Sequence, residues 1–185
     1  MSNATPNLKP IDPSTADASI AASLAAVKAK LGSVPNMFLT LAHTPVALNG
    51  YLQLSAATAG GKLSARQREA IALAVAEQNS CGYCLAAHNA IGGMVGLTPA
   101  DIAAARDGRA TNARDAALVE LAADITAKRG NLTAGEVASY RAKGLSEADI
   151  LEVLTNVALN ILTNYVNHVA ATEIDFPAVP LKKAA

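Results

Sequence analysis

Residues 69–88 read EAIALAVAEQNSCGYCLAAH and join an apolar run to a group of reactive side chains. The stretch contains the only two cysteines of the chain, Cys81 and Cys84, in a C-x-x-C arrangement. His88 follows Cys84 by four residues, and Glu69 precedes Cys81 by twelve. Residues three or four positions apart on a helix lie on one face. The spacing therefore predicts that both thiols and the imidazole point the same way.

This arrangement favours thiol redox chemistry. Helical residues three positions apart are separated by roughly 5–6 Å, which a disulfide bond tolerates. Asn79 or Ser80 is predicted to cap a helix that opens at Cys81, and the positive end of that helix favours a thiolate. The His88 imidazole can exchange a proton with a thiol, and the Glu69 carboxylate can orient the imidazole.

The cysteine pair also has plainer interpretations. Free cysteines are often buried core residues, although the C-x-x-C spacing with a histidine four residues later disfavours this. The motif offers three ligands to zinc, whereas structural zinc usually takes four and no second pair of this kind exists here. Haem attachment needs a histidine directly after the second cysteine, where this chain has Leu85. We therefore expect neither a metal nor a cofactor.

Glu69 has alternatives of its own. A lone glutamate near a helix start commonly faces solvent or stabilises the helix dipole. Glu77 lies nearer to the cysteines, and spacing does not exclude it from the same role. A carboxylate that is buried at this position needs a partner. We favour His88 as that partner, with Arg66 or Arg68 as the alternative.

The pattern E-x11-C-x2-C-x3-H resembles that of the alkyl hydroperoxidase D-like (AhpD-like), peroxidase-related branch of the carboxymuconolactone decarboxylase family. The segments GSVPNMFLTLAHTPVALNGY and NHVAATEIDFP are also similar, and together the similarity covers most of residues 30–177. The residue before the second cysteine is often histidine in the best-known members and is Tyr83 here. The decarboxylase members generally lack the cysteine pair, so its presence favours the redox branch.

The resemblance implies an all-helical fold, a trimeric or hexameric assembly, and thiol-dependent peroxidase or disulfide reductase activity. It also implies that Glu69 and His88 relay protons to the thiols of Cys81 and Cys84, often through a water molecule.

Composition narrows the possible partners. The formal net charge is +0 and no basic block is present, which argues against a nucleic acid or an anionic membrane as a partner. The longest apolar run, Ala70–Ala76, is too short to span a bilayer. No apolar segment typical of a signal peptide is visible near the N-terminus. We expect a cytoplasmic, reducing location, where a C-x-x-C pair is more often catalytic than structural.

Helix-start and helix-stop signals predict one all-α domain over residues 14–177, between an N-terminal arm (1–13) and a C-terminal tail (178–185). We expect a multi-helix bundle with a long buried C-terminal helix. Nine helices are predicted. Their approximate bounds are Ser14 or Thr15 to Leu31, Asn36 to Ala42, Pro45 to Gly60, Ser64 to the end of a central buried run, Cys81 to between Gly92 and Gly96, Thr98 to Gly108, Ala113 to Arg129, Thr133 to Gly144, and Ala148 to Thr172. His43, between two of these helices, is predicted to be a capping or surface residue; the alternative is that it lines the pocket.

The last predicted helix is long and apolar on most sides, so we expect it to provide both core and subunit interface of a homo-oligomer. Asn160, Asn164, Asn167 and His168 recur along it at near-helical spacing. We interpret them as buried polar pairs that fix the packing register. The alternative is that His168 or Tyr165 reaches the thiol pocket of its own or a neighbouring subunit.

Together these observations predict a hydroperoxide reductase. Cys84 is predicted to attack the peroxide because His88 can deprotonate it, and Cys81 to resolve the sulfenic acid as a disulfide. The reverse order is open, because the first thiol of a C-x-x-C site often has the lower pKa. A dithiol protein or a small thiol then reduces the disulfide. The alternatives are a decarboxylase-type lyase that uses His88 and Glu69 as acid and base, and a redox-sensing oligomer without catalysis.

Overall fold

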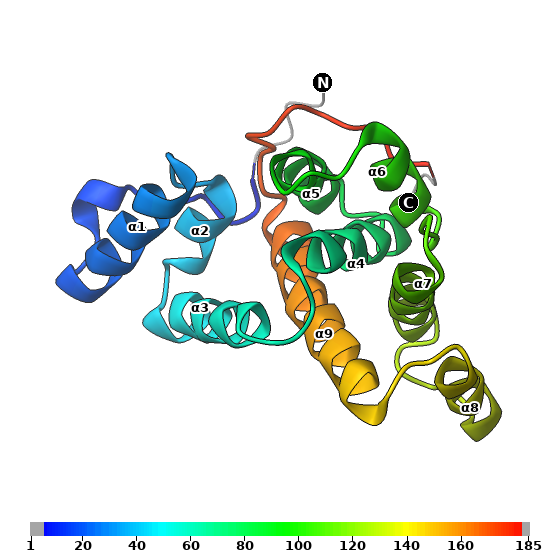
Figure 1. Ribbon diagram of the computed structural model, residues 1–185. Helices are drawn as coiled ribbons and strands as arrows, with labels where there is room; N and C mark the ends of the chain where they lie inside the picture. Colours follow the sequence, from blue (N-terminus) through cyan, green and yellow to red (C-terminus); the bar gives the residue numbers. More distant parts are fainter. Residues whose placement is uncertain (1–5, 183–185) are drawn as a thin grey trace.

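The computed structural model describes residues 6–182, and every regular element in this range is a helix (Figure 1). In chain order these are η1 (Pro13–Thr15, a 3-10 helix), α1 (Ala18–Leu31), α2 (Asn36–Leu41), α3 (Pro45–Ala59), α4 (Ala65–Gln78), α5 (Gly82–Met94), α6 (Pro99–Arg106), α7 (Ala113–Ala127), α8 (Ala134–Ala142) and α9 (Glu147–Ala170). The predicted all-α fold class is confirmed. Residues 1–5 of the predicted arm and 183–185 of the predicted tail lie outside the described range.

Helix α4 lies at the centre of the fold. It begins with a capping box, in which the Ser64 N–H donates to Gln67 Oε1 at 2.9 Å and the Gln67 N–H donates to Ser64 Oγ at 3.3 Å. Every residue in the range 70–77 is buried. Helices α5, α6, α7 and α9 pack around this run. Because the run has no polar face, its sequence requires such enclosure.

Helices α1, α2 and α3 stand to one side of α9 (Figure 1). The buried residues of α1, including Leu24 and Val27, belong to the same hydrophobic cluster as Phe38 of α2 and Leu73 of α4. Cys81 and Cys84 are also members of this cluster. The thiols therefore lie where the α1–α3 part of the chain meets the central helices.

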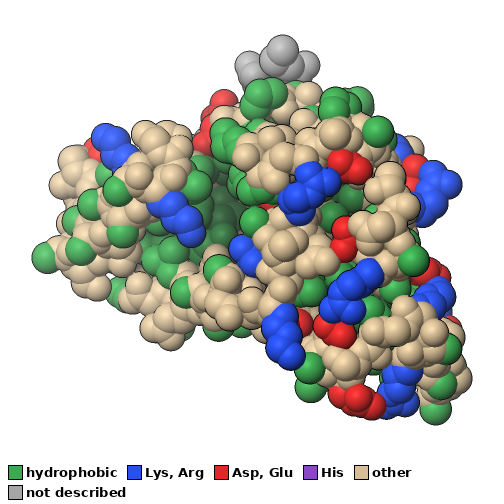
Figure 2. All heavy atoms as spheres, viewed as in Figure 1, with side chains coloured by type: hydrophobic (Ala, Val, Ile, Leu, Met, Phe, Trp, Pro, Cys, Tyr) green, Lys and Arg blue, Asp and Glu red, His purple; other side chains and the backbone are tan. Residues whose placement is uncertain are grey.

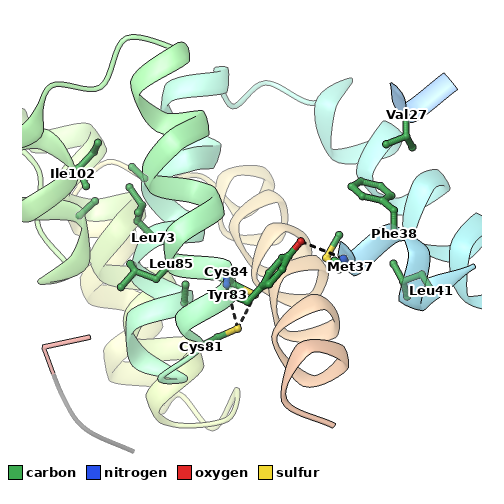
Figure 3. Close-up of a cluster of buried hydrophobic side chains, with 14 of the residues drawn as sticks. Val27, Met37, Phe38, Leu41, Leu73, Cys81, Tyr83, Cys84, Leu85 and Ile102 are labelled. Carbon is green, nitrogen blue, oxygen red and sulfur yellow. Dashed lines mark hydrogen bonds between the residues drawn. The ribbon is translucent and has the colours of Figure 1, made fainter. Parts of the chain in front are cut away.

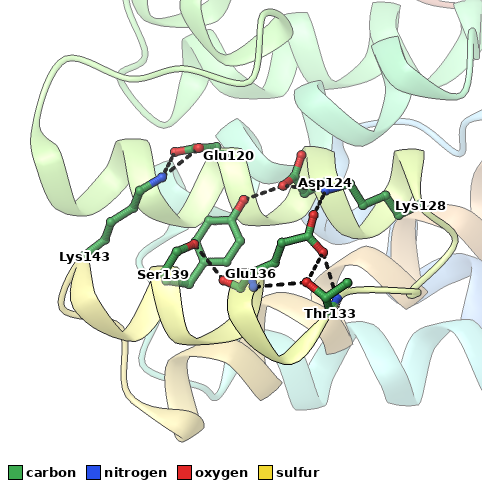
Figure 4. A network of polar contacts seen from close by, with 8 residues as sticks. Glu120, Asp124, Lys128, Thr133, Glu136, Ser139 and Lys143 are labelled. Carbon is green, nitrogen blue, oxygen red and sulfur yellow. Dashed lines mark hydrogen bonds and ion pairs between the residues drawn. The ribbon is translucent and has the colours of Figure 1, made fainter.

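Helices α7 and α8 pack together on the other side of α4. Their contact is polar at its edge: the Tyr140 hydroxyl donates to Asp124 at 2.8 Å, and Lys143 forms an ion pair with Glu120 at 2.7 Å (Figure 4). Tyr140 itself is buried in a second hydrophobic cluster that α7 shares with α9. This part of the fold supports α4 and α9 and does not line the thiol region.

Helix α9 is the longest helix, with 24 residues, and it is buried on one face only. Its opposite face exposes a row of large apolar side chains: Leu151, Leu154, Leu162, Tyr165 and Val169. This row fits the expected subunit interface, and the homo-oligomer stays a prediction. Neither α9 nor any other helix within residues 6–182 combines the length and apolarity needed to cross a membrane.

Two predicted helix starts are wrong. Helix α1 is capped by Asp17, which accepts from the Ile20 N–H at 2.8 Å. Ser14 and Thr15 instead belong to η1, because the Asp12 side chain accepts from the Ser14 N–H and caps this short helix. The remaining helix bounds differ from the predicted ones by one or two residues at most of the ends.

Helix α5 is capped by Cys81 and not by Asn79 or Ser80. Asn79 is the C-terminal cap of α4, and Ser80 has a left-handed backbone with φ of 54°. Such a residue ends one helix and cannot begin the next. The first thiol therefore lies one position outside the helix.

The two ends of the described chain are fixed by hydrogen bonds. The Asn7 N–H donates to the Ala170 carbonyl at the end of α9 at 2.8 Å, and the Ile11 N–H donates to the Leu39 carbonyl of α2 at 3.2 Å, so the N-terminal segment is held against both helices. In the tail, the Lys182 N–H donates to Glu77 at 2.6 Å, and Arg106 Nε donates to the same carboxylate at 2.7 Å. Glu77 thus joins α4, α6 and the tail.

We expect Glu77→Ala to lower the free energy of unfolding by about 3 kcal/mol, because it leaves the guanidinium of Arg106 buried without its partner. Urea denaturation measures this, and limited proteolysis should show earlier cleavage in the tail. In the control Glu147→Ala, the carboxylate that pairs with Arg141 is 74% exposed, so the loss should stay below about 1 kcal/mol. Equal losses in the two variants would contradict a structural role for the Glu77 contact.

Candidate active site

Cys81 and Cys84 meet at the N-terminus of α5. The Cys84 N–H donates to Cys81 Sγ at 3.4 Å, and the Cys81 thiol donates to Cys84 Sγ, with the two sulfur atoms 2.8 Å apart (Figure 3). Both are free thiols, and their residues are only 1% and 3% exposed. Since a disulfide bond is about 2.05 Å long, a displacement of less than one ångström would join them.

The pKa values of the two thiols are shifted in opposite directions by their surroundings. The hydrogen bond from Cys81, the charge of His88 and the amides of Asn167 and Asn164 outweigh burial and lower the pKa of Cys84 to about 7. The same hydrogen bond, together with burial and the charge of Cys84, raises the pKa of Cys81 far above its ordinary value. Of the two residues, Cys84 therefore loses its proton more readily, and Cys81 stays a thiol.

His88 and Glu69 form a direct contact between α5 and the N-terminal part of α4. His88 Nδ1 lies 2.8 Å from Glu69 Oε2, and both side chains are partly exposed. Burial lowers the pKa of His88, but the charge and hydrogen bond of Glu69, the charge of Cys84 and the amide of Asn160 together raise it above its ordinary value. These contacts favour the positively charged form of the imidazole next to Cys84.

The alternative partners of Glu69 are engaged elsewhere. Arg66 forms an ion pair with Asp101 at 3.3 Å, and Arg68 donates to the carbonyl of Leu63 at 2.5 Å. Glu77, the other carboxylate considered for the role of Glu69, accepts hydrogen bonds from Arg106 and Lys182. Within residues 6–182, no three His, Cys, Asp or Glu side chains come together in a way that could hold a metal ion.

A cavity of about 290 Å³ adjoins this group of side chains. Cys84, His88 and Glu69 line it, whereas Cys81 does not. Much of the remaining wall is apolar or aromatic and comes from α1, α2, α3, α5, α9 and the tail: Val27, Met37, Phe38, Tyr51, Leu52, Tyr83, Leu159 and Phe176. Figure 2 shows a hollow lined by hydrophobic side chains between the α1–α3 part and the rest of the molecule. A ligand in the cavity can therefore contact Cys84, whereas Cys81 lies behind it.

Tyr83 occupies the position between the two cysteines and points away from them. Its hydroxyl accepts from the Met37 N–H at 3.2 Å, and its ring contacts Phe176 edge to face (Figure 3). Burial and the nearby Asp175 raise its pKa well above the ordinary value. The side chain links α5 to α2 and the tail, and it shapes the cavity wall.

The cavity of this chain is not lined by the three residues for which a place in the pocket was the alternative interpretation: His43, Tyr165 and His168. His43 is exposed, and its Nε2 lies 2.7 Å from the Lys9 carbonyl, which agrees with the predicted surface role. Tyr165 is 55% exposed on the outer face of α9, and His168 is exposed as well. Whether either residue reaches a neighbouring subunit stays an open prediction.

The sequence interpretation missed the asparagines of α9 as part of the site. Asn167 Nδ2 donates to Cys84 Sγ at 3.2 Å, and Asn160 is one of the groups that act on His88. The regular spacing of Asn160, Asn164 and Asn167 was a visible signal. It indicated a common face, but not that this face meets α5.

Comparison with known proteins agrees with this fold and motif. Residues 45–123, which include Glu69, Cys81, Cys84 and His88, match the sequence model of the Carboxymuconolactone decarboxylase family. The part of the chain that carries the candidate site is therefore similar to this family. No curated protein matches the sequence.

Solved structures share the fold of this chain over nearly its whole length. An uncharacterized peroxidase-related protein from Ralstonia eutropha JMP134, described as an alkylhydroperoxidase AhpD core, has a TM-score of 0.83 at 22% identity and 94% coverage of both chains. A peroxidase-related protein from Silicibacter sp. TM1040 has a TM-score of 0.79 at 23% identity, again with 94% coverage of both. A cysteine-to-alanine variant of the debrominase Bmp8, in complex with 2,3,4-tribromopyrrole, has a TM-score of 0.79 at 19% identity, covering 95% of this chain and 94% of that one.

We expect Cys84 to titrate near pH 7, with the thiolate present above that pH, because its pKa is lowered to about 7. Thiolate absorbance at 240 nm and the rate of iodoacetamide alkylation should both rise with that midpoint. Mass spectrometry should locate the first alkyl group on Cys84 and not on Cys81. A midpoint near that of an ordinary thiol, or first alkylation at Cys81, would reverse the assignment of the two residues.

Proposed function

We propose that this protein is a thiol-dependent hydroperoxide reductase that acts through its C-x-x-C pair. The observation that carries the proposal is the position of Cys84. Its sulfur is held as a thiolate on the wall of an apolar cavity, and the Cys81 thiol lies 2.8 Å away on the side that does not line the cavity. A nucleophile that faces the substrate, with a resolving thiol in contact with it, supports a two-electron reduction.

The first step transfers one oxygen atom. The Cys84 thiolate attacks the outer oxygen of the hydroperoxide, the O–O bond breaks, and Cys84 becomes a sulfenic acid. The departing alkoxide needs a proton, which the His88 imidazolium supplies to give the alcohol. Glu69, at 2.8 Å from His88 Nδ1, keeps the imidazole oriented and favours its reprotonation.

The second step closes the disulfide. Cys81 attacks the sulfur of the Cys84 sulfenic acid, a disulfide forms, and the hydroxyl group leaves as water with the proton of the Cys81 thiol. An external dithiol protein or small thiol then reduces the disulfide by exchange, which returns both thiols. A reducing compartment such as the cytoplasm would supply these reductants.

The cavity suggests the class of substrate. Its volume of about 290 Å³ is at the small end of the range found for ligand pockets, and its wall is largely apolar. Such a space suits an organic hydroperoxide with a hydrocarbon or aromatic body, with the peroxide group directed to Cys84 and His88.

Steady-state consumption of cumene hydroperoxide with several dithiol donors tests the proposal. The native protein should turn over, and Cys84→Ser should lose activity at least a thousandfold. Cys81→Ser should consume one equivalent of peroxide and stop as a sulfenic acid, which dimedone labels on Cys84. If the double cysteine variant is as active as the native protein, or if a disulfide forms but no donor supports turnover, the protein is not a hydroperoxide reductase.

We expect Glu69→Gln to slow peroxide reduction by at least about tenfold while the fold is kept, because the neutral amide no longer favours the imidazolium of His88. The effect should be largest above neutral pH, where His88 then loses its proton. Stopped-flow measurement of the peroxide step from pH 6 to 9 checks this, with Glu147→Gln as a surface control. Identical rates and profiles in the Glu69 variant and the native protein would remove Glu69 from the mechanism.

A second candidate is reductive dehalogenation of a small aromatic compound. It is favoured by the aromatic side chains on the cavity wall, Phe38, Tyr51, Tyr83 and Phe176, and by the fold shared with the debrominase. Replacing a C–Br bond by C–H consumes two electrons and a proton and releases bromide, and a dithiol supplies those electrons when it becomes a disulfide. Bromide release from 2,3,4-tribromopyrrole, without peroxide turnover, would favour this candidate.

The family also contains decarboxylases, so acid–base chemistry needs its own control. A decarboxylase-type lyase would use His88 and Glu69 and would not need the thiols. Full activity of Cys84→Ser on a carboxylated lactone would support that function over both redox candidates.

A further inference from the structure

We infer that Asn164 and Asn167 of α9 form an amide site that stabilises negative charge on Cys84, and that Asn79 orients this site. The role of these amides in peroxide turnover rests on the proposed function. Their action on the sulfur atom does not, because it concerns the resting thiolate alone.

Asn167 contacts the reacting atom directly. Its Nδ2 donates to Cys84 Sγ at 3.2 Å, and the residue is buried. Its Oδ1 is buried without a hydrogen-bond partner among the described residues. Turning the amide by half a rotation would place this oxygen against a thiolate, which repels it. The chemistry of the sulfur atom therefore selects the orientation in which the N–H group faces Cys84.

Asn164 supplies a second donor. The residue is fully buried, and its Oδ1 accepts from Asn79 Nδ2 at 2.8 Å. Its Nδ2 is buried and has no hydrogen-bond partner among residues 6–182. Buried donors are rarely left unpaired because the loss of water is costly. The same amide is one of the groups that lower the pKa of Cys84, which supports an interaction of its free N–H group with the sulfur atom.

Asn79 acts through Asn164. It is the C-terminal cap of α4, two residues before Cys81, and its amide reaches across to α9. By occupying Oδ1 of Asn164, it leaves only the N–H groups of that side chain free to interact with Cys84. Asn79 is therefore a positioning residue, while Asn164 and Asn167 act on the sulfur atom.

The other titratable groups near Cys84 are few. Cys81 and His88 of the α5 region lower its pKa, and Glu69 of α4 acts through His88. Tyr51 of α3 and Tyr83 of α5 also interact with the charge of Cys84 and stay protonated at neutral pH because burial raises their pKa. None of these groups is altered in the variants below, so a change in the titration of Cys84 reports on the amides.

The test is a titration of the Cys84 thiolate at 240 nm in the full-length, reduced protein, without peroxide. Asn167→Leu and Asn164→Leu should each raise the midpoint by at least half a pH unit, and Asn167→Asp should raise it further. Asn79→Ala should give a smaller rise. The matched control is Asn156→Leu, on the same helix and also buried, whose amide donates to the Glu152 carbonyl and not to sulfur. Its midpoint should stay at the native value.

Thermal unfolding of the same proteins separates this effect from a packing effect. A purely structural role would lower the melting temperature in all the leucine variants and leave every midpoint unchanged, which would overturn the inference. Where a leucine variant does not fold, Asn79→Ala and Asn167→Ser provide the same comparison. A shifted midpoint in a protein that reduces no peroxide would support the inference and reject the proposed function.

Discussion

The absence of a polar side on α4 is the constraint on which the rest of the structure depends. Its central run, residues 70–77, is enclosed by α5, α6, α7 and α9. Enclosure forces the carboxylates at the two ends of the run to find partners. Glu77 pairs with Arg106 of α6, and that end of the run becomes a structural contact. Glu69 pairs with His88 on the wall of a cavity, so that end can take part in proton transfer.

The thiol pair owes its asymmetry to the place where α5 begins. Cys81 caps the helix, whereas Cys84 lies inside its first turn and faces both the cavity and α9. The amides of α9 and the charge of His88 then act on Cys84 alone. Two chemically identical side chains three residues apart thereby differ in protonation at neutral pH, which is a requirement for any dithiol site in which one sulfur atom attacks and the other resolves.

Much of this arrangement could be predicted from local sequence signals. The capping boxes that begin with Ser64, Thr98, Thr133 and Ser146 all form as expected, because each needs only residues three positions apart. The contact between Glu69 and His88 was also predicted, from the burial that an apolar helix imposes on its N-terminal part.

The errors have a common physical cause, since local signals do not decide between neighbouring candidates. Ser14, Thr15 and Asp17 can all cap a helix, and only the turn around Asp12 selects Asp17. The left-handed backbone of Ser80 likewise moves the start of α5 to Cys81. The contact of Asn167 with Cys84 joins residues 83 positions apart, so it depends on the packing of α9 and not on spacing.

The close approach of the two sulfur atoms bears on the irreversible oxidation of Cys84 by excess peroxide. A sulfenic acid that meets a second peroxide is converted to a sulfinic acid, which thiols do not reverse. Here the second peroxide would have to enter the same narrow cavity before a thiol already at contact distance reacts. In a hydroperoxide reductase with this geometry, the proximity of the two sulfur atoms would favour disulfide formation over overoxidation.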